Sequence, residues 1–290
     1  MTEKVAVLGL GTMGGRAAAA IMGAGHEVVG FDPMAAAAER AAEGGLTIAG
    51  TAVEAIANAD IVVMSVPLPD HVRELADGAL QTARRGTVIV DISTIDPATA
   101  RYAAEVLARQ GVVYLDSPVL GRPAGCGSWT LVVGGAESDV ARVTPLLEAT
   151  IAKRMARIGD VGSGSVVKIL NNLMFGAINA VTAEALQLCR ASGIEMSVFV
   201  DAVVDSGAAT VSNLFRDIGP RIAAGDDEPV FSLALLAKDN RLARALAADV
   251  GLDAPIADAV DALNGVALDL GYGARDSSAV AHAYRLPDQS

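Results

Sequence analysis

Short apolar runs alternate with segments of helical periodicity through the first 160 residues of the chain. The runs cover residues 5–8, 28–29, 61–64, 88–90 and 112–115. Each run is apolar throughout, which is typical of a parallel strand covered by helices on both faces. Helices are expected near residues 13–24, 35–43, 70–80 and 97–109. This alternation predicts an α/β fold with a doubly wound, parallel sheet and right-handed crossovers.

The pattern changes after Gly159, where strand-like runs disappear and long segments with a period near 3.6 follow. These segments lie near residues 166–191, 197–204, 233–250 and 256–268. We therefore expect two domains, an α/β domain of residues 1–160 and an all-helical domain of residues 161–290. The second domain is expected to begin with a helix of about 25 residues that joins it to the first.

A glycine-rich turn directly follows the first apolar run. Its sequence, Gly9-Leu-Gly-Thr-Met-Gly14, fits the G-x-G-x-x-G pattern between a strand and a helix. The glycines permit a tight turn and a close approach of the backbone to a pyrophosphate at the helix N-terminus. The pattern predicts a Rossmann dinucleotide-binding domain. The cofactor-binding candidates in this turn are Gly9, Gly11, Thr12, Met13 and Gly14.

Asp32 stands at the end of the second predicted strand, where such domains recognise the ribose next to the adenine. Its carboxylate suits the ribose diol of NAD and would repel the 2′-phosphate of NADP. No arginine follows it immediately. The sequence therefore favours NAD over NADP as the cofactor.

Two further strand ends carry proline or polar residues. Residues 65–69 (SVPLP) and 91–94 (DIST) follow the third and fourth runs, at the edge where ligands bind in such sheets. Val66 and Thr94 are therefore candidates for cofactor binding. For Thr94 an ordinary helix start is the alternative, since Asp96 is a suitable N-cap for the next helix.

A lysine and two asparagines lie near the start of the long helix. Lys168 and Asn172 are one helical turn apart, and Asn171 is adjacent. Their neighbours are apolar nearly all round, which predicts a buried helix. A buried lysine is costly unless it has a partner or a function, and burial lowers a lysine pKa toward values that suit proton transfer. A lysine whose stem lies on the surface while its ammonium reaches water is the alternative.

Four stretches of the chain match, in order, the motifs of one enzyme family. They are Gly9-Leu-Gly-Thr-Met-Gly14, Asp116-Ser-Pro-Val-Leu-Gly121, Gly162-Ser-Gly-Ser-Val-Val-Lys-Ile-Leu-Asn-Asn172, and Lys238-Asp239 with Leu242-Ala243. They resemble the cofactor loop, the substrate loop, the catalytic segment and the late K-D-L-x-L-A segment of the β-hydroxyacid dehydrogenases. That family includes 3-hydroxyisobutyrate, tartronate semialdehyde and sulfolactaldehyde reductases. The set of four is more specific than any one motif.

The resemblance implies roles for the matched residues. Lys168 would be the general acid and base, giving a proton to the carbonyl oxygen as hydride arrives and receiving it in the oxidative direction. Asn172 and Asn171 would hold the substrate, and Lys238 would close over the nicotinamide end of the cofactor. The chemistry is coherent, because a nearby ammonium stabilises the negative charge that develops on the oxygen.

The substrate loop departs from the family pattern. Leu120 replaces the usual serine, and Gly121-Arg122-Pro123 replaces the common Gly-Gly continuation. We expect Leu120, Gly121 and Arg122 to bind the substrate, with the guanidinium holding a carboxylate or sulfonate in place of the missing hydroxyl. The sulfolactaldehyde reductase branch also has Gly-Arg here, which keeps an organosulfonate open. A surface charge is the alternative for Arg122, and Trp129 is expected to pack in the core.

Composition limits the partners and the compartment. The formal net charge of −12 opposes nucleic acid and anionic membranes as partners, and it leaves room for a local basic pocket. Two cysteines are too few for a disulfide framework, and the histidines are not clustered, so no metal site is expected. The N-terminus lacks a signal-peptide pattern and no apolar run reaches the ~20 residues of a membrane span, which predicts a cytoplasmic protein.

The sequence therefore predicts an NAD-dependent dehydrogenase that interconverts a short 3-hydroxy acid, or a hydroxy sulfonate, and its aldehyde. A homodimer or homotetramer is expected from the long bridging helix and the apolar C-terminal helices. The alternatives are an imine reductase of the same architecture and a non-enzymatic cofactor-binding protein. Members of both groups tend to lack the lysine, so Lys168 argues against them.

Overall fold

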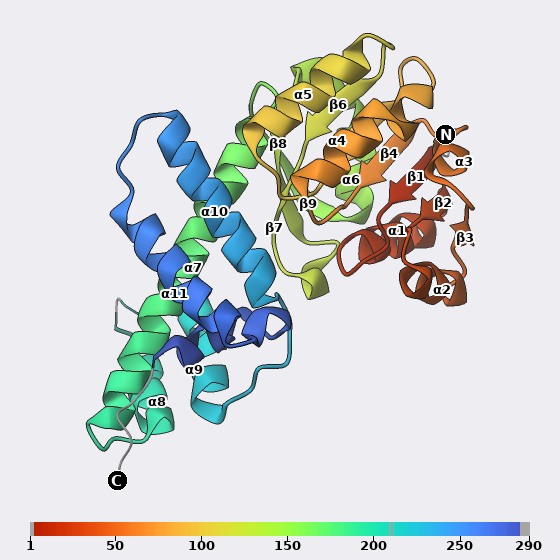
Figure 1. Cartoon of the computed structure of the whole chain (residues 1–290). Coiled ribbons are helices and arrows are strands. Elements are labelled where there is room, and N and C mark those ends of the chain that lie inside the picture. Colours follow the sequence, from red (N-terminus) through yellow and green to blue (C-terminus); the bar gives the residue numbers. More distant parts are fainter. Residues whose placement is uncertain (1–2, 209, 211, 285–290) are drawn as a thin grey trace. The chain divides into compact units, whose positions relative to one another are not determined.

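The structure is a computed structural model that describes residues 3–208, 210 and 212–284. It divides into two compact units, Met1–Lys168 and Ile169–Ser290. The division falls within one long helix, α7 (Ser163–Ala191). Figure 1 labels the elements of both units.

A sheet forms the middle of the first unit (Figure 1). Its strands are β1 (Lys4–Leu8), β2 (Glu27–Phe31), β3 (Thr47–Ile48), β4 (Ile61–Met64), β5 (Val88–Asp91), β6 (Val113–Asp116), β7 (Val119–Leu120), β8 (Trp129–Gly134) and β9 (Ala152–Gly159). They follow the order β3-β2-β1-β4-β5-β6-β8-β7, and β9 pairs with β8. From β3 to β6 all neighbours are parallel, whereas β8 is antiparallel to β6 and β7. The predicted doubly wound α/β fold is confirmed.

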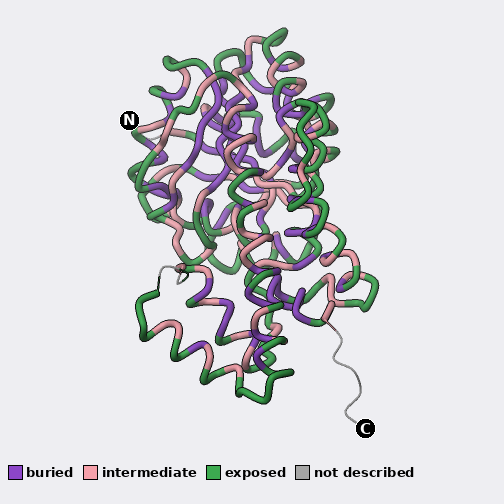
Figure 2. Tube along the Cα trace, turned by 90° about the vertical axis from the view of Figure 1, so that its left-hand side faces the viewer, coloured by how far each residue is buried: buried purple, intermediate pink, exposed green. Residues whose placement is uncertain are grey.

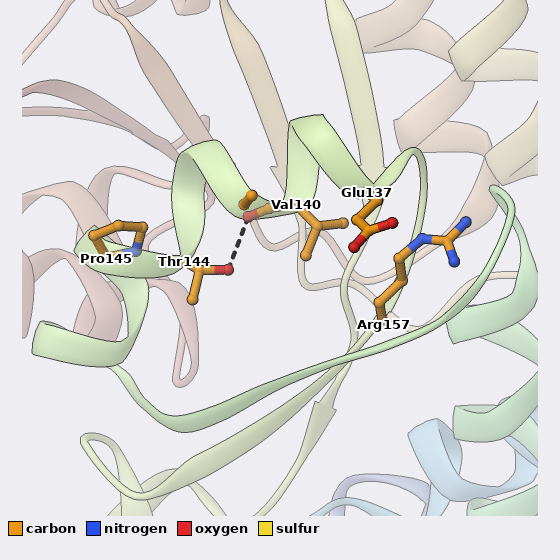
Figure 3. Close-up of a pocket in the computed structure, with 6 residues that line it drawn as sticks. Glu137, Val140, Thr144, Pro145 and Arg157 are labelled. Carbon is orange, nitrogen blue, oxygen red and sulfur yellow. Dashed lines mark hydrogen bonds between the residues drawn. The ribbon is translucent and has the colours of Figure 1, made fainter.

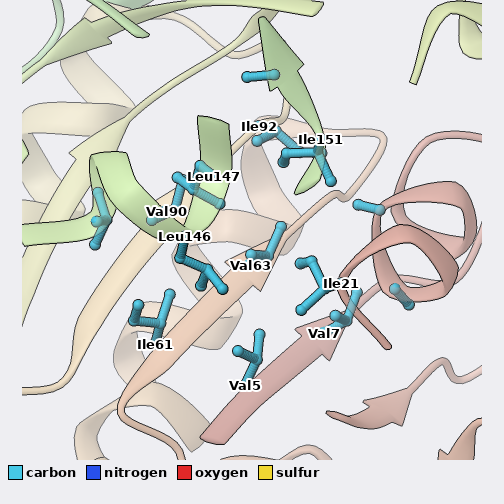
Figure 4. Packing of buried hydrophobic residues seen from close by; sticks show 14 of the residues in the cluster. Val5, Val7, Ile21, Ile61, Val63, Val90, Ile92, Leu146, Leu147 and Ile151 are labelled. Carbon is cyan, nitrogen blue, oxygen red and sulfur yellow. The ribbon is translucent and has the colours of Figure 1, made fainter. Parts of the chain in front are cut away.

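Helices cover both faces of this sheet because successive side chains of each central strand enter different cores. The helices are α1 (Gly14–Gly23), α2 (Ala35–Glu43), α3 (Ala52–Ile56), α4 (Pro69–Asp77), α5 (Pro97–Ala108) and α6 (Glu137–Thr150), with short 3₁₀ turns η1 (Ala79–Thr82) and η2 (Pro123–Gly125). Val5 and Val7 of β1 pack in the cluster drawn in Figure 4, together with Ile21 of α1 and Leu147 of α6. Leu8 packs in the cluster on the other face, which α3, α4 and α5 cover.

The sequence pattern did not predict α6 or α9 (Asn213–Ala224), and each contains a proline, Pro145 or Pro220. Proline inside a helix removes a backbone hydrogen bond and usually ends the helix. Burial of apolar side chains outweighs that cost here, since Leu147 beyond Pro145 and Ile222 beyond Pro220 are both buried.

The second unit is all-helical among its described residues, as the sequence pattern predicts. It contains most of α7, followed by α8 (Met196–Ser206), α9, α10 (Leu233–Asp249), α11 (Pro255–Asp269), η3 (Tyr272–Ala274) and η4 (Ser277–Ala283). Its core includes Leu186 of α7, Val200 of α8, Leu233 of α10 and Val280 of η4. Buried and exposed residues alternate along these helices. Figure 2 colours the chain by burial, with buried stretches mostly inside and exposed stretches mostly on outer turns.

The prediction that α7 is buried on most sides is wrong for the single chain. Leu170, Met174, Val181 and Leu188 are 47–65% exposed and recur at helical spacing. By length and composition alone α7 is the one described helix able to cross a membrane, which corrects the expectation that no stretch is long enough. Long helices in the cores of soluble proteins pass the same test, so it is weak evidence for a membrane span.

Candidate active site

The turn after β1 is built so that only glycine fits at two of its positions. Gly9 has a φ of +87°, and a methyl group there would overlap the carbonyl oxygen of Ser65. A methyl group at Gly14 would overlap the carbonyl oxygen of Gly9. At Gly11 an added methyl group meets nothing within 4 Å, so the backbone there is open to a ligand. These features fit a dinucleotide, whose pyrophosphate needs a close approach to the backbone at the start of α1.

Asp32 holds this turn from the end of β2. Its Oδ2 accepts a 2.6 Å hydrogen bond from the Leu10 N–H, and its Oδ1 accepts one of 2.8 Å from the Met34 N–H. A carboxylate oxygen has two lone pairs, so each oxygen keeps capacity for a ribose hydroxyl. The same carboxylate therefore shapes the glycine turn and keeps hydrogen-bond acceptor capacity for the ribose.

A chain of hydrogen bonds connects the ends of β4 and β5 to Tyr114 within β6. Val66 N–H donates to Ser93 Oγ at 2.9 Å, and Ser93 N–H donates to Asp91 Oδ1 at 2.8 Å. Tyr114 O–H donates to Asp91 Oδ2 at 2.5 Å. Burial raises the pKa of Asp91, although its hydrogen bonds with Ser93 and Tyr114 oppose the increase. Sequence reasoning missed Ser93 and Tyr114, because partners on other strands leave no mark in the local pattern.

One of the two interpretations of Thr94 predicted that an ordinary helix start follows it, and α5 does begin there. Asp96 is the N-cap of α5 and its Oδ1 accepts the Thr99 N–H at 2.8 Å. Thr94 is half-buried and lies two residues before this cap. The helix start is thus confirmed at Asp96, and Thr94 stays a predicted cofactor contact.

A second buried carboxylate fixes the start of α7. Asp116 ends β6 and is 1% exposed. Its two oxygens accept 2.7 Å hydrogen bonds from the N–H groups of Gly162 and Ser165, in the place where a helix needs an N-terminal acceptor. A side chain at Gly164 would come within 2.7 Å of the Asp116 carbonyl oxygen, so the contact is tight. Burial raises the pKa of Asp116 to about 6.

Lys168 lies on the second turn of α7, directly after this clamp. It is half-buried, and its Nζ donates a 2.7 Å hydrogen bond to the carbonyl oxygen of Val119. Val119 is three residues beyond Asp116 in the predicted substrate loop. The loop is therefore bonded to the start of α7 at two points, the Asp116 carboxylate and the Val119 carbonyl.

The three predicted substrate residues of this loop become more exposed to solvent along the chain. Leu120 is half-buried in β7, and Gly121 and Arg122 are exposed. Trp129 is 1% exposed, which confirms that it packs in the core. Its indole N–H also donates a 2.8 Å hydrogen bond to the carbonyl oxygen of Arg122, a contact that the sequence did not predict.

A separate polar network lies in the second unit. Asn172 Nδ2 donates to Asp239 Oδ2 at 2.5 Å, and Lys238 Nζ lies 2.8 Å from Asp239 Oδ1. Asn171 is exposed and its Nδ2 donates to Asn172 Oδ1 at 3.0 Å. The structure thus brings Asn171, Asn172 and Lys238 together around Asp239, a buried acid to which sequence reasoning assigned no role.

A surface hollow elsewhere in the first unit holds none of the predicted site residues. It has a volume of about 570 Å³ and lies between α6 and β9, beside Glu137, Thr144 and Arg157 (Figure 3). Thr144 Oγ1 donates to the Val140 carbonyl and Arg157 Nε donates to the Gly135 carbonyl, both at 2.8 Å. Thr144 and Arg157 thus bind nearby backbone carbonyls. The carboxyl ends of the parallel strands are the place where ligands bind in such sheets.

Two family models together cover nearly the whole chain. The model described as the NAD binding domain of 6-phosphogluconate dehydrogenase matches residues 4–159. The model described as NAD-binding of NADP-dependent 3-hydroxyisobutyrate dehydrogenase matches residues 162–284.

Individual relatives agree with these matches. A probable 3-hydroxyisobutyrate dehydrogenase of Mycobacterium bovis is 34% identical over 97% of each chain. The solved structure of Mycobacterium tuberculosis 3-hydroxyisobutyrate dehydrogenase with L-serine is 32% identical, with a TM-score of 0.88 over 99% of this chain and all of that one. A Streptomyces aurantiacus imine reductase is 26% identical over 98% of this chain and all of that one, with a TM-score of 0.66.

These matches assign the class of the protein. The chain belongs to the β-hydroxyacid dehydrogenase family. It is an NAD(P)-dependent oxidoreductase that acts on a CH–OH group. The predictions of the family, of the enzyme class and of NAD as the cofactor are confirmed.

Proposed function

We propose that this enzyme interconverts a short 3-hydroxy acid, or the corresponding hydroxy sulfonate, and its aldehyde with NAD. The observation that carries the proposal is the 2.7 Å hydrogen bond between Lys168 Nζ and the Val119 carbonyl. It holds an ammonium group against the loop that continues into Leu120, Gly121 and Arg122. The proton donor on α7 is therefore bonded to the loop that carries Arg122, three residues before that arginine.

Lys168 is the general acid and base in this proposal. When bound, NADH would supply the hydride for reduction and NAD⁺ would accept it in oxidation. In reduction, Lys168 Nζ gives a proton to the carbonyl oxygen, and in oxidation it takes the hydroxyl proton. The Val119 carbonyl keeps the amine in one direction, and the ammonium stabilises the charge that grows on the substrate oxygen. The two hydrogen bonds to the Asp116 carboxylate fix the start of α7 and therefore the position of Lys168.

The substrate loop and the asparagines recognise the rest of the substrate. The exposed Arg122 guanidinium binds the carboxylate or sulfonate through paired N–H donors, and the half-buried Leu120 packs against the carbon chain. Asn171 and Asn172 supply amide groups one turn after Lys168 on α7. A leucine in place of a hydroxyl donor makes the guanidinium the main source of anion affinity in this loop.

The remaining candidates bind the cofactor. Asp32 accepts the ribose hydroxyls and disfavours the 2′-phosphate of NADP, which underlies the proposed preference for NAD. Gly9, Gly11 and Gly14 with Thr12 and Met13 bind the pyrophosphate. Val66 and Thr94 contact the cofactor from the ends of β4 and β5. Lys238, whose side chain is 16% exposed and paired with Asp239, closes over the nicotinamide end.

Lys168→Ala tests the mechanism. We expect kcat to fall at least a thousandfold, because the proton donor is lost, while the Kd for NAD changes less than threefold. The substrates to test are 3-hydroxyisobutyrate, glycerate, 4-hydroxybutyrate and 2,3-dihydroxypropane-1-sulfonate, monitored by absorbance of the reduced nicotinamide. Lys153→Ala, which removes an exposed lysine of β9, is the control and should keep full activity. Near-normal turnover by Lys168→Ala would contradict the proposed mechanism.

The exposed apolar side chains and the net charge support a proposal about partners. We propose a homodimer or homotetramer, because the exposed apolar residues Leu170, Met174, Val181 and Leu188 recur along α7 and a second chain would remove them from water. We also propose a cytoplasmic location. The net charge of −12 supports a small anionic substrate at a local basic group, without nucleic acid or membrane partners. Size-exclusion chromatography with light scattering tests the oligomer.

The imine reductase alternative has support from the Streptomyces aurantiacus structure, but that similarity is weaker, with a TM-score of 0.66 against 0.88. A non-enzymatic cofactor-binding role has no use for the Lys168–Val119 contact. NAD-linked turnover of cyclic imines, with silence on every hydroxy acid, would favour the imine reductase. NAD binding without any turnover would favour the non-enzymatic role.

A further inference from the structure

The carbonyl oxygen of Arg122 is bonded from two directions. It accepts the indole N–H of Trp129 at 2.8 Å and the backbone N–H of Gly125 at 2.9 Å. The second bond closes a tight turn that contains the 3₁₀ segment η2. The first connects this turn to a side chain that is 1% exposed. A buried indole N–H requires an acceptor, and here that acceptor belongs to the residue proposed to bind the substrate anion.

The indole ring also supports the turn by direct contact. A methyl group added at Gly121 would lie 2.6 Å from Trp129 Cδ1, which is closer than atoms can pack. The ring therefore lies against the Gly121 backbone, on the residue just before Arg122. Trp129 itself belongs to the buried cluster that contains Val119 and Leu131, so the ring is held by the core. The turn rests on a rigid support.

The strand that carries Trp129 is paired regularly on one side and irregularly on the other. The register of β8 against β9 shifts between Trp129 and Thr130. On the other side of β8, Thr130 still pairs with Leu120 and Leu131 with Val119. The extra residue at this shift is Lys153 of β9, because Trp129 pairs with Ala152 and Thr130 with Arg154. β8 therefore keeps regular pairing with β7, which leads directly into the Gly121-Arg122 turn.

We propose that Trp129 is a positioning residue for anion recognition. By bonding the Arg122 carbonyl and packing on Gly121, it sets the direction in which the exposed guanidinium meets the carboxylate or sulfonate of the substrate. A turn that is already fixed loses less conformational freedom when the anion binds, which favours affinity. This inference rests on the proposed function of Arg122, and it adds the residue that makes the guanidinium effective.

Trp129 is the only tryptophan in the chain, so its fluorescence reports on this turn without any turnover. The full-length enzyme, free of NAD, is titrated with 3-hydroxypropanoate and with 2-hydroxyethanesulfonate, which differ only in the anionic group. 1,3-Propanediol serves as the uncharged control. We expect a saturable change in emission with the anions and none with the diol. Arg122→Gln should remove the response, and an unchanged response in that variant would overturn the proposal.

Trp129→Phe tests the hydrogen bond, because it keeps an aromatic ring and removes the N–H. We expect the KM for the anionic substrate to rise about fivefold, the usual effect of one lost hydrogen bond, with kcat and the Kd for NAD unchanged. In the Arg122→Gln background the same substitution should add nothing to KM, because the group it positions is gone. Ser128→Ala, an exposed neighbour in the loop, is the control and should behave as wild type.

The outcomes separate this inference from the proposed function. Additive effects of the two substitutions on KM, or a fall in kcat at unchanged KM, would mean that Trp129 has only a structural role. An anion response without NAD-linked turnover would support the positioning of Arg122 and contradict the dehydrogenase assignment of the substrate class. Turnover of hydroxy acids by wild type, with Trp129→Phe indistinguishable from it, would leave the proposed function standing and overturn the inference.

Discussion

The loops that follow β1 and β6 lie at the same edge of a parallel sheet, but they are fixed in different ways. The loop after β1 is fixed by the absence of side chains at Gly9 and Gly14, where none fits, together with one hydrogen bond from the Leu10 N–H to the Asp32 carboxylate. The loop after β6 is fixed by side-chain hydrogen bonds. Trp129 donates to the Arg122 carbonyl, Lys168 donates to the Val119 carbonyl, and the Asp116 carboxylate at the start of the loop accepts the Gly162 N–H.

The difference matches what each loop binds. A pyrophosphate is the same in every dinucleotide and is recognised by backbone N–H groups, so a fixed backbone shape is sufficient. A substrate differs from enzyme to enzyme and is recognised by side chains, which can be exchanged without altering the strand that carries them. We therefore expect substitutions in the first loop to abolish cofactor binding and substitutions in the second to change catalysis or specificity.

Gly14→Ala should have the largest effect. The added methyl group would overlap the Gly9 carbonyl, so the turn must open, and we expect the affinity for NAD to fall more than a hundredfold in isothermal titration calorimetry. Gly23→Ala, at the other end of α1, is the matched control, since a methyl group there meets nothing within 4 Å. Normal NAD binding by Gly14→Ala would remove the distinction between the two loops.

Asp116 should make the stability of the first unit depend on pH. Its pKa is about 6 in the folded protein against 3.8 as the ordinary value, so the folded state binds this proton more tightly than the unfolded chain does. The contribution of this group to the free energy of unfolding is therefore full below pH 3.8 and is lost as the pH rises through 6, by roughly 3 kcal/mol. Urea unfolding from pH 4 to 8 measures it.

Asp116→Asn is the control for this pH dependence, because an amide does not titrate in this range. The difference in the free energy of unfolding between wild type and this variant should decrease from pH 4 to 7 and then stay level. A difference that is constant with pH would show that the carboxyl group ionises normally. At pH 8 the kcat of the variant should also fall about tenfold. The amide N–H₂ group would face an N–H donor of α7 with no acceptor between them, which loosens the helix that carries Lys168.

Tyr114→Phe should have the smallest effect of the three. It removes a 2.5 Å hydrogen bond to the buried Asp91, and we expect the free energy of unfolding to fall by about 1–2 kcal/mol. NAD binding should change less than threefold, because the Ser93 N–H still holds Asp91. Tyr102→Phe removes a similar bond to Asp77 at the surface and should cost less than about 0.5 kcal/mol. Equal costs would show that burial does not strengthen the Asp91 contact.

Much of the fold could be predicted from the sequence. The parallel strands of the first unit carry continuous apolar runs, and the helices of the second carry a period near 3.6, so the core itself imposes both patterns. Prediction failed where burial outweighed a local signal. Pro145 and Pro220 argue for breaks in helices that nevertheless continue. Strand β9 was missed for another reason. It is polar and rich in lysine and arginine, and it lacks the apolar run of a central strand because it pairs only with β8.

The sequence by itself determined the glycine turn, Asp32 and the Lys168–Asn172 segment, because the chemistry of each depends on residues close together along the chain. Only the tertiary structure decided three contacts. The Asp116 carboxylate accepts N–H groups at the start of α7, Lys168 donates to the Val119 carbonyl, and Trp129 donates to the Arg122 carbonyl. These contacts join residues on different elements, 7–49 positions apart. A local pattern records the period of a helix or strand, but not which side chain a distant backbone group will meet once the core has packed.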